Sequence, residues 1–145
     1  MNARAWATSV ALLGLSVFGP SAARADDDAL TAALRQVVAG NIAAFNKEDA
    51  DATMSYVDTD SPDYEMTKNE LPGMFKDYDL TSELVSFTLI GHDDEFAVAR
   101  VRQKTTGKTQ SHFADNTVDS IMIFHQENGS WRLWSEEVLG VELGH

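Results

Sequence analysis

The chain has 145 residues, of which 11 are basic and 23 acidic, so its formal net charge at pH 7 is −12. A chain this acidic repels phosphate backbones and anionic lipid, which argues against nucleic-acid binding and against a basic membrane-binding surface. It contains no cysteine, so no disulfide supports the fold and stability must come from the core.

The first 25 residues are predicted to be a cleavable export signal. Arg4 precedes an apolar run that ends at Phe18, and a small-residue tract then closes with Ala23-Arg24-Ala25, which suits a signal peptidase. The run is shorter than the roughly 20 apolar residues of a membrane-spanning helix. We therefore expect cleavage after Ala25, a periplasmic or secreted protein without a membrane anchor, and a single domain at 26–145 with a formal charge of −14.

The first half of the predicted domain shows helical periodicity. Asp28 is expected to cap a helix that ends at about Asn46, because apolar residues recur at helical spacing at Leu30, Leu34, Val37, Val38, Ile42 and Phe45. A short second helix is expected from Asp49 to about Val57. Thr67 and Glu70 have the spacing of a capping box and predict a third helix to about Tyr78, which the Pro72-Gly73 pair would shorten or kink.

Strand patterns follow Leu80. We predict strands at 84–90, 96–104, 117–126 and 131–139, because apolar and β-branched residues dominate there between turn formers. Asn128-Gly129, between the last two strands, is the strongest hairpin signal in the chain. Helices followed by an antiparallel meander predict an α+β fold.

Two segments resemble the nuclear transport factor 2-like superfamily, in its SnoaL-like exported branch. One is the end of the first helix with the start of the second, Ala43-Ala44-Phe45-Asn46-Lys47-Glu48-Asp49-Ala50-Asp51. The other is the terminal hairpin, in which Ile121-Met122-Ile123-Phe124 leads through Asn128-Gly129-Ser130 to Trp131-Arg132-Leu133-Trp134-Ser135-Glu136-Glu137. The resemblance spans nearly all of 29–139.

The resemblance implies a cone, in which three N-terminal helices pack on a curved antiparallel sheet of about four strands and an apolar pocket opens between them. It also implies a homodimer through the outer face of the sheet. In the third predicted strand, Met122 and Phe124 alternate with Ile121 and Ile123, so both faces are apolar and both should be covered. The alternative is a thick monomeric core.

The resemblance also includes enzymes that use a carboxylate as a proton shuttle. The candidates here are Asp119, Glu136 and Glu137. Asp119 could act as a general base in an apolar pocket, or it could form an ion pair with Arg100 or Arg102. Glu136 is expected on one face with Arg132, Trp134 and Val138. Its simpler interpretation is as a cross-strand partner of a basic residue on the second predicted strand.

Histidines offer a second kind of chemistry, because dehydratase-like members of the superfamily pair His with Asp. His112, just before the third predicted strand, could reach the mouth of a pocket and pair with Asp119. His92, His125 and His145 are expected to be solvated. The acidic clusters match no calcium loop, and no His or Cys cluster suggests zinc, so neither a metal nor a cofactor is expected.

Aromatic residues are the more promising functional feature. Most must be core, but some should line the cone with a polar group that orients a ligand. The residues expected at the pocket are Tyr56, Tyr64, Met66, Phe75, Asp119 and Trp134. The preferred hypothesis is an exported domain that binds a small apolar or amphipathic ligand, or a partner. The alternatives are an isomerase, dehydratase or cyclase with Asp119 as general base, and a structural dimerisation domain.

Overall fold

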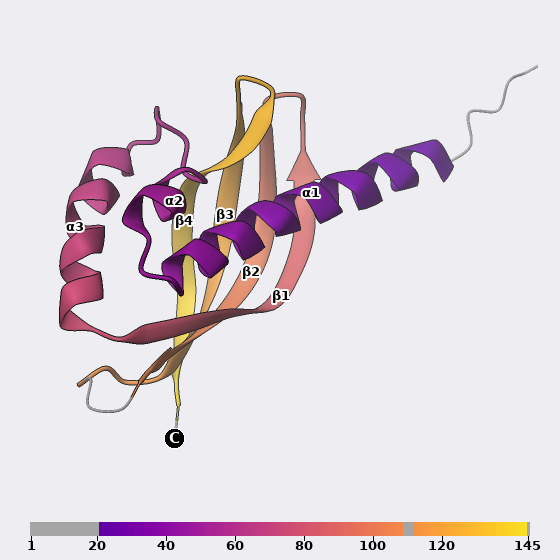
Figure 1. The fold of residues 1–145 in the computed structure, drawn as a ribbon. Helices are drawn as coiled ribbons and strands as arrows, with labels where there is room; N and C mark the ends of the chain where they lie inside the picture. Colours follow the sequence, from indigo (N-terminus) through magenta and orange to yellow (C-terminus); the bar gives the residue numbers. More distant parts are fainter. Residues whose placement is uncertain (1–20, 109–111, 145) are drawn as a thin grey trace, which may run out of the picture.

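A computed structural model describes residues 21–108 and 112–144 of the chain. Three helices, α1 (Ser21–Phe45), α2 (Ala50–Met54) and α3 (Tyr64–Asp77), precede four strands, β1 (Leu80–His92), β2 (Phe96–Gly107), β3 (Asn116–Glu127) and β4 (Ser130–Leu143). The strands form one antiparallel sheet in the order β1-β2-β3-β4, and the helices lie on one face of its curve (Figure 1). The predicted α+β architecture is confirmed.

Most of the predicted export signal, up to residue 20, lies outside the described residues. Residues 21–25 belong to α1, which therefore begins before the predicted cap at Asp28 and ends at Phe45, as predicted. The first turns of α1 extend past the β1 edge of the sheet (Figure 1), and the described side chains from Ala23 to Ala29 are exposed. Within the described part of the chain, no helix is long and apolar enough to cross a membrane.

The core lies between α1 and the inner face of the sheet. Leu34, Val38 and Ile42 of α1 are buried against β2 and β3. Alternation along β2 and β3 sends the following buried side chains inward: Ala97, Ala99, Val101, Met122 and Phe124. Small residues on β2 leave room for the larger side chains of α1, so helix and sheet bury a single apolar cluster.

Helix α2 is shorter than predicted because the chain leaves it to pair with the sheet. Asp49 caps its start by accepting a hydrogen bond from the Ala52 amide at 2.9 Å. After Met54 the backbone turns, and Val57 forms a parallel bridge with Leu133 on the outer edge of β4. The amide of Asp58 donates to the Leu133 carbonyl at 2.8 Å, so this segment pairs with the edge of the sheet at Leu133.

Helix α3 does not begin at Thr67. Its N-cap is Asp63, and the Thr67 amide already donates to the Asp63 carbonyl at 2.9 Å, so the predicted capping box is wrong. The helix continues through Pro72 for 14 residues. The extra first turn places Tyr64 and Met66 on a helix rather than in a loop.

The terminal hairpin is the predicted one. Asn128 and Gly129 have positive φ values of 51° and 80°, as a two-residue turn between twisted strands requires. Register shifts opposite Ile123/Phe124 and Asp119/Ser120 place an extra residue in β4 at Trp134 and at Leu139. Such bulges curve a strand and change which residues face inward. The bulge at Trp134 determines where Glu136 lies.

Candidate functional site

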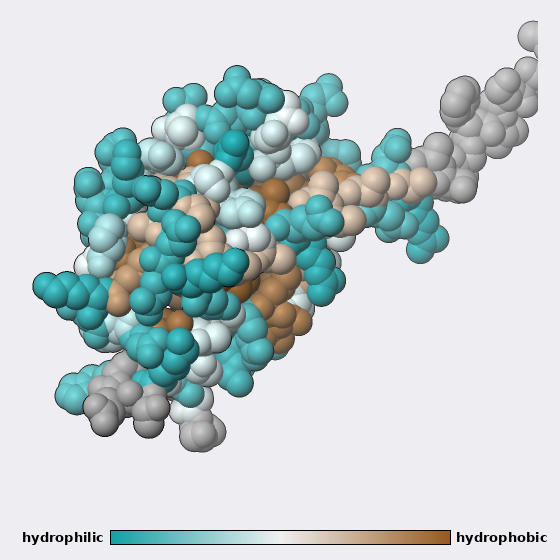
Figure 2. Space-filling view, in the orientation of Figure 1, coloured by the Kyte–Doolittle hydropathy of each residue, from teal (hydrophilic) through white to brown (hydrophobic). Residues whose placement is uncertain are grey.

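The main candidate site is a cavity of about 400 Å³ between α1, α3 and the inner face of the sheet, which we call the inner pocket. Figure 2 shows hydrophobic surface in the region between α3 and the C-terminal half of α1, under a largely hydrophilic exterior. The lining combines apolar and polar side chains from every layer: Asn41, Phe45, Thr53, Val57, Ser61, Asp63, Met66, Thr67, Leu71, Gln103, Met122, Leu133, Trp134, Ser135 and Glu136.

Several polar groups of this lining are already engaged in holding the walls together. The Asn41 side-chain amide donates to the Thr53 carbonyl at 3.0 Å and so joins α1 to α2. The Ser61 hydroxyl donates to the Trp134 carbonyl at 2.6 Å and joins the loop before α3 to β4. These bonds fix the position of α2 relative to α1, and of the loop before α3 relative to β4.

The two carboxylates of the lining are not engaged in this way. Among the described residues, neither Asp63 nor Glu136 has an ion-pair partner, and neither carboxylate accepts a hydrogen bond. Both side chains are exposed. They remain available to a ligand at the rim of the pocket.

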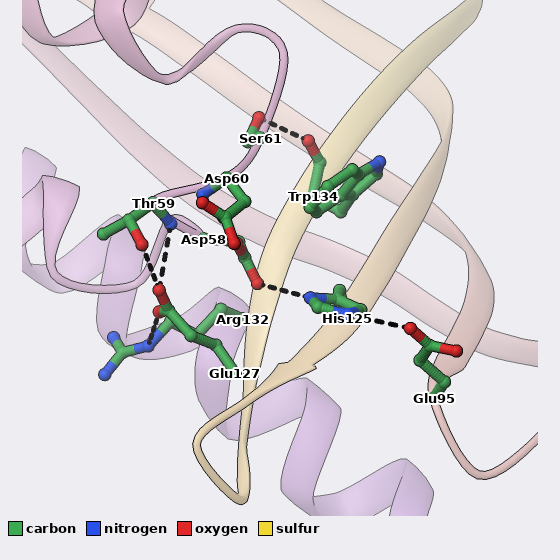
Figure 3. Close-up of polar contacts among 9 residues, drawn as sticks. All are labelled: Asp58, Thr59, Asp60, Ser61, Glu95, His125, Glu127, Arg132 and Trp134. Atoms are coloured by element: carbon green, nitrogen blue, oxygen red, sulfur yellow. Dashed lines mark hydrogen bonds and ion pairs between the residues drawn. The ribbon is translucent and has the colours of Figure 1, made fainter.

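The wall formed by the loop before α3 is fastened from the other side of the sheet (Figure 3). Asp58 is fully buried (0% exposed), and its Oδ2 lies 2.7 Å from Nδ1 of His125 on the outer face of β3. Its Oδ1 accepts the Asp60 amide at 2.9 Å, and its backbone carbonyl accepts the Ser61 amide at 3.1 Å. One carboxylate thus shapes the loop and ties it to the sheet.

His125 is enclosed rather than solvated, contrary to the sequence-based expectation. Its side chain is 18% exposed and lies between the rings of Phe96 and Trp134, at centroid distances of 4.7 and 5.0 Å. The hydrogen bond to Asp58 raises the pKa of His125, against the opposing effect of burial, and Glu95 at 3.5 Å from Nε2 adds to the rise. The Asp58–His125 pair faces away from the inner pocket.

A second hollow of about 560 Å³ lies between α2, α3 and the β3–β4 hairpin, and we call it the side hollow. Tyr64 and Lys68 line it, with the Lys68 ammonium 5.7 Å from the ring centre of Tyr64. Arg132 Nε lies 2.9 Å from Glu127 Oε2 as an ion pair without hydrogen-bond geometry, and Glu127 also accepts from Thr59. This hollow is larger, but none of its lining residues belongs to the apolar cluster between α1 and the sheet, which includes Met122 and Leu133 of the inner pocket.

Asp119 is not at a pocket, which corrects the proposed general base. Residues 119, 121, 123 and 125 alternate with the buried residues of β3 and so face outward. There, Arg100 binds both oxygens of Asp119 at 2.9 and 2.6 Å and lowers the pKa of this carboxyl. A half-buried, ion-paired carboxylate with a lowered pKa is a poor proton acceptor, so the ion-pair alternative is the correct one.

The other predicted pocket residues divide between several places. Met66 and Trp134 line the inner pocket, although the Trp134 ring packs outward on His125. Tyr64 lines the side hollow, and Tyr56 lines a shallow depression beside Gly40. Phe75 packs edge-on against Phe45, at 5.2 Å between ring centres, and so supports the pocket from behind.

His112 and the two glutamates of β4 complete the predicted set. His112 is exposed, with no described contact to Asp119. The bulge at Trp134 turns Glu136 to the inner face, opposite Met122, so the expected partnership with a basic residue on β2 is wrong. Glu137, opposite Ile121, faces outward. Among the described residues, no group of three or more His, Asp or Glu side chains could hold a metal ion.

Solved structures of similar shape share this fold at low sequence identity. A protein from Novosphingobium aromaticivorans, provisionally named a scytalone dehydratase, superposes with a TM-score of 0.67 at 9% identity, over 84% of this chain and 92% of that one. An NTF2-like protein with a cystatin-like fold from the same species gives 0.65 at 15% identity, over 86% and 90%. A provisional NTF2-like dehydratase from Streptomyces avermitilis gives 0.63 at 10% identity, over 77% and 96%.

These likenesses show the NTF2-like fold that the two sequence motifs resemble. No curated protein sequence matches the chain. A family model does match residues 36–143, which is most of the chain and includes the inner pocket, and its description differs from that of the SnoaL-like branch. The chain belongs to the family described as the C-terminal domain of the anti-sigma-I factor RsgI9.

Proposed function

We propose that this chain is an exported domain that binds a small apolar or amphipathic ligand in the inner pocket. The observation that carries the proposal is the pocket itself. A volume of about 400 Å³ falls within the usual size of ligand sites, roughly 300–1,000 Å³. Phe45, Leu71 and Met122 supply apolar surface, and hydrogen bonds from Asn41 and Ser61 hold the surrounding segments in place.

Binding is favoured over catalysis by the placement of the titratable groups. None of the described residues that line the inner pocket is a histidine, and the Asp58–His125 pair lies on the opposite face of the sheet. Asp119, the general base of the enzymatic alternative, lies on that outer face too. The matching family takes its name from an anti-sigma factor rather than an enzyme, which also supports a binding role.

The proposal is tested by filling the pocket. Thr67 lines the inner pocket, whereas its neighbour Lys68 lines the side hollow. We expect Thr67→Trp to abolish saturable binding of a hydrophobic fluorescent probe, and Lys68→Trp, which adds the same ring one residue away, to retain it. Equal binding by both variants would place the ligand elsewhere and refute the proposal.

Export is part of the proposal and is supported by the start of α1. The described side chains of residues 23–25 are exposed, so cleavage after Ala25 removes none of the described core. It would leave Asp26, Asp27 and Asp28 in the first turn of the shortened helix. Negative charge there stabilises the helix, because the N-terminal end of the helix dipole is positive. Intact mass measurement of the protein recovered from a bacterial periplasm should give a chain that begins at Asp26.

We also propose that the domain forms a homodimer through the outer face of the sheet. Met122 and Phe124 are buried on the helical side, whereas Ile121 and Ile123 face outward from the same strand with Val98 of the adjacent one. This division of the apolar residues is what a strand covered by helices on one side and by a second subunit on the other would show.

A further inference from the structure

We infer that the inner pocket selects ligands that carry a positive charge at one end of an apolar body, such as an alkylamine or a quaternary ammonium compound. This inference rests on the proposed function and adds the chemical class of the ligand. It is carried by the charge of the lining, by the absence of partners for its carboxylates, and by the side of β4 on which one of them lies.

The lining is charged with one sign only. Among the described residues that line it, Asp63 and Glu136 are the only ionisable side chains, and none is Lys, Arg or His. The net charge of the chain does not by itself produce this pattern, because the neighbouring side hollow holds Lys68 and Arg132 beside Asp51 and Glu127. The inner pocket is thus a local site of negative potential, which repels anionic ligands and attracts cations.

Three carboxylates of the surrounding elements already have a partner. Asp58 binds His125, Glu127 binds Arg132, and Asp119 binds Arg100. Asp63 and Glu136 lack a partner of this kind among the described residues, and the Asp63 side chain does not cap its own helix. A ligand cation can therefore pair with them without displacing an existing ion pair.

The position of Glu136 is the most specific of these observations. The inner face of β4 otherwise presents apolar side chains, Leu133 before it and Val138 after it, and Met122 lies directly opposite. Without the extra residue at Trp134, strand alternation would send position 136 to the outer face. The bulge therefore delivers a carboxylate to the one part of the sheet where an apolar ligand would lie.

The two parts of the ligand then have separate contacts. Phe45 and Leu71 receive the apolar body, and Met66, which is 55% exposed at the rim, covers it. The cation remains at the rim beside Asp63 and Glu136, partly hydrated, so its attraction adds selectivity to an affinity that comes mainly from apolar burial.

Three probes with the same decyl chain test the inference on the full chain as purified: decyltrimethylammonium, a neutral decyl glycoside and decyl sulfate, each below its micelle concentration. Isothermal titration should give the order cation, neutral, anion, with about tenfold between the first and the last. This preference should weaken as salt is added, because the charges are exposed.

Matched variants separate the pocket from the net charge of the protein. Glu136→Gln should weaken binding of the cation about threefold and strengthen binding of the anion, whereas Glu137→Gln removes the same charge from the outer face and should change neither. Asp63→Asn, which keeps a residue suited to a helix N-cap, should act like Glu136→Gln.

The outcomes distinguish the inference from the function on which it rests. Equal affinities for the three probes, or equal effects of Glu136→Gln and Glu137→Gln, would overturn the charge selectivity while the pocket remains a binding site. Binding of no probe, or binding that Thr67→Trp leaves intact, would overturn the proposed function and the inference together.

Discussion

The Asp58 carboxylate lies 2.7 Å from the Nδ1 atom of His125, across 67 residues of sequence and from one side of β4 to the other. The contact joins the loop that forms one wall of the inner pocket to the outer face of the sheet. This residue pair therefore links the surface proposed for ligand binding to the surface proposed for dimerisation.

Asp58 should be a main determinant of loop stability. Asp58→Ala removes the acceptor of both the His125 and the Asp60 hydrogen bonds from a fully buried position. We expect a loss of about 1–3 kcal/mol in the free energy of unfolding, measured with urea, and weaker ligand binding. Asp60→Ala, which removes the same charge from an exposed neighbour, should do neither, and similar losses in the two variants would contradict this assignment.

Stability should depend on pH through His125. Because its pKa is raised in the folded protein, its contribution is fully present below the ordinary histidine value of about 6.5 and is lost as the pH rises through the folded pKa. As the pH rises from about 6.5 through the folded pKa of His125, the free energy of unfolding should therefore fall relative to that of a His125→Gln variant. His92, whose pKa is also raised, by Asp27, is replaced by Gln in both proteins so that its contribution cancels.

The titration of His125 can also be followed directly by NMR. We expect a midpoint above that of an unstructured histidine, and a return toward the ordinary value in Asp58→Asn, since the hydrogen bond to Asp58 is the main cause of the rise. A midpoint at or below 6.5 in the unmodified chain would show that burial outweighs the Asp58 contact.

Gly40 should be coupled to Tyr56. A Cβ atom added at Gly40 would lie 2.5 Å from the Tyr56 hydroxyl, so the ring must move. An alanine in the interior of a helix otherwise gains about 1 kcal/mol over glycine. Gly40→Ala should therefore stabilise a Tyr56→Ala background but not the parent chain, and urea denaturation of the four proteins gives the coupling. Equal effects in the two backgrounds would mean that the ring moves without cost.

The proposed dimer is tested by light scattering at micromolar concentration. We expect twice the mass of the monomer for the parent chain. Ile123→Asp places a charge in the centre of the outer face and should have the mass of the monomer. Val141→Asp, on the inner side of β4 and already 55% exposed, is the control and should remain dimeric. A monomeric parent chain would rule the dimer out.

Much of the fold could be predicted from local patterns. The end of α1 at Phe45 and the hairpin at Asn128-Gly129 depend on apolar periodicity and on a turn that few residues can form, and both were placed correctly. The start of α3 was not, because Thr67 and Glu70 have the spacing of a cap while the effective cap is Asp63. Local signals of this kind compete, and tertiary packing selects among them.

The candidate site was less predictable because it depends on one bulge and one distant contact. Alternation along β3 correctly grouped Asp119 with Ile121 and Ile123, but periodicity does not say which face of a doubly apolar strand is inside. The extra residue at Trp134 reversed the expected side of Glu136. Nothing in the sequence relates Asp58 to His125, since only the folded chain brings them together.

The most direct test of the central claim is to map the amide signals that move in NMR spectra when decyltrimethylammonium is added to the full chain. A ligand in the inner pocket should shift Thr53, Gln103 and Ser135 in a saturable manner and leave Ser55 and Asn69 of the side hollow unchanged. Shifts centred on Ser55 and Asn69, or spread over the outer face of the sheet, would contradict it.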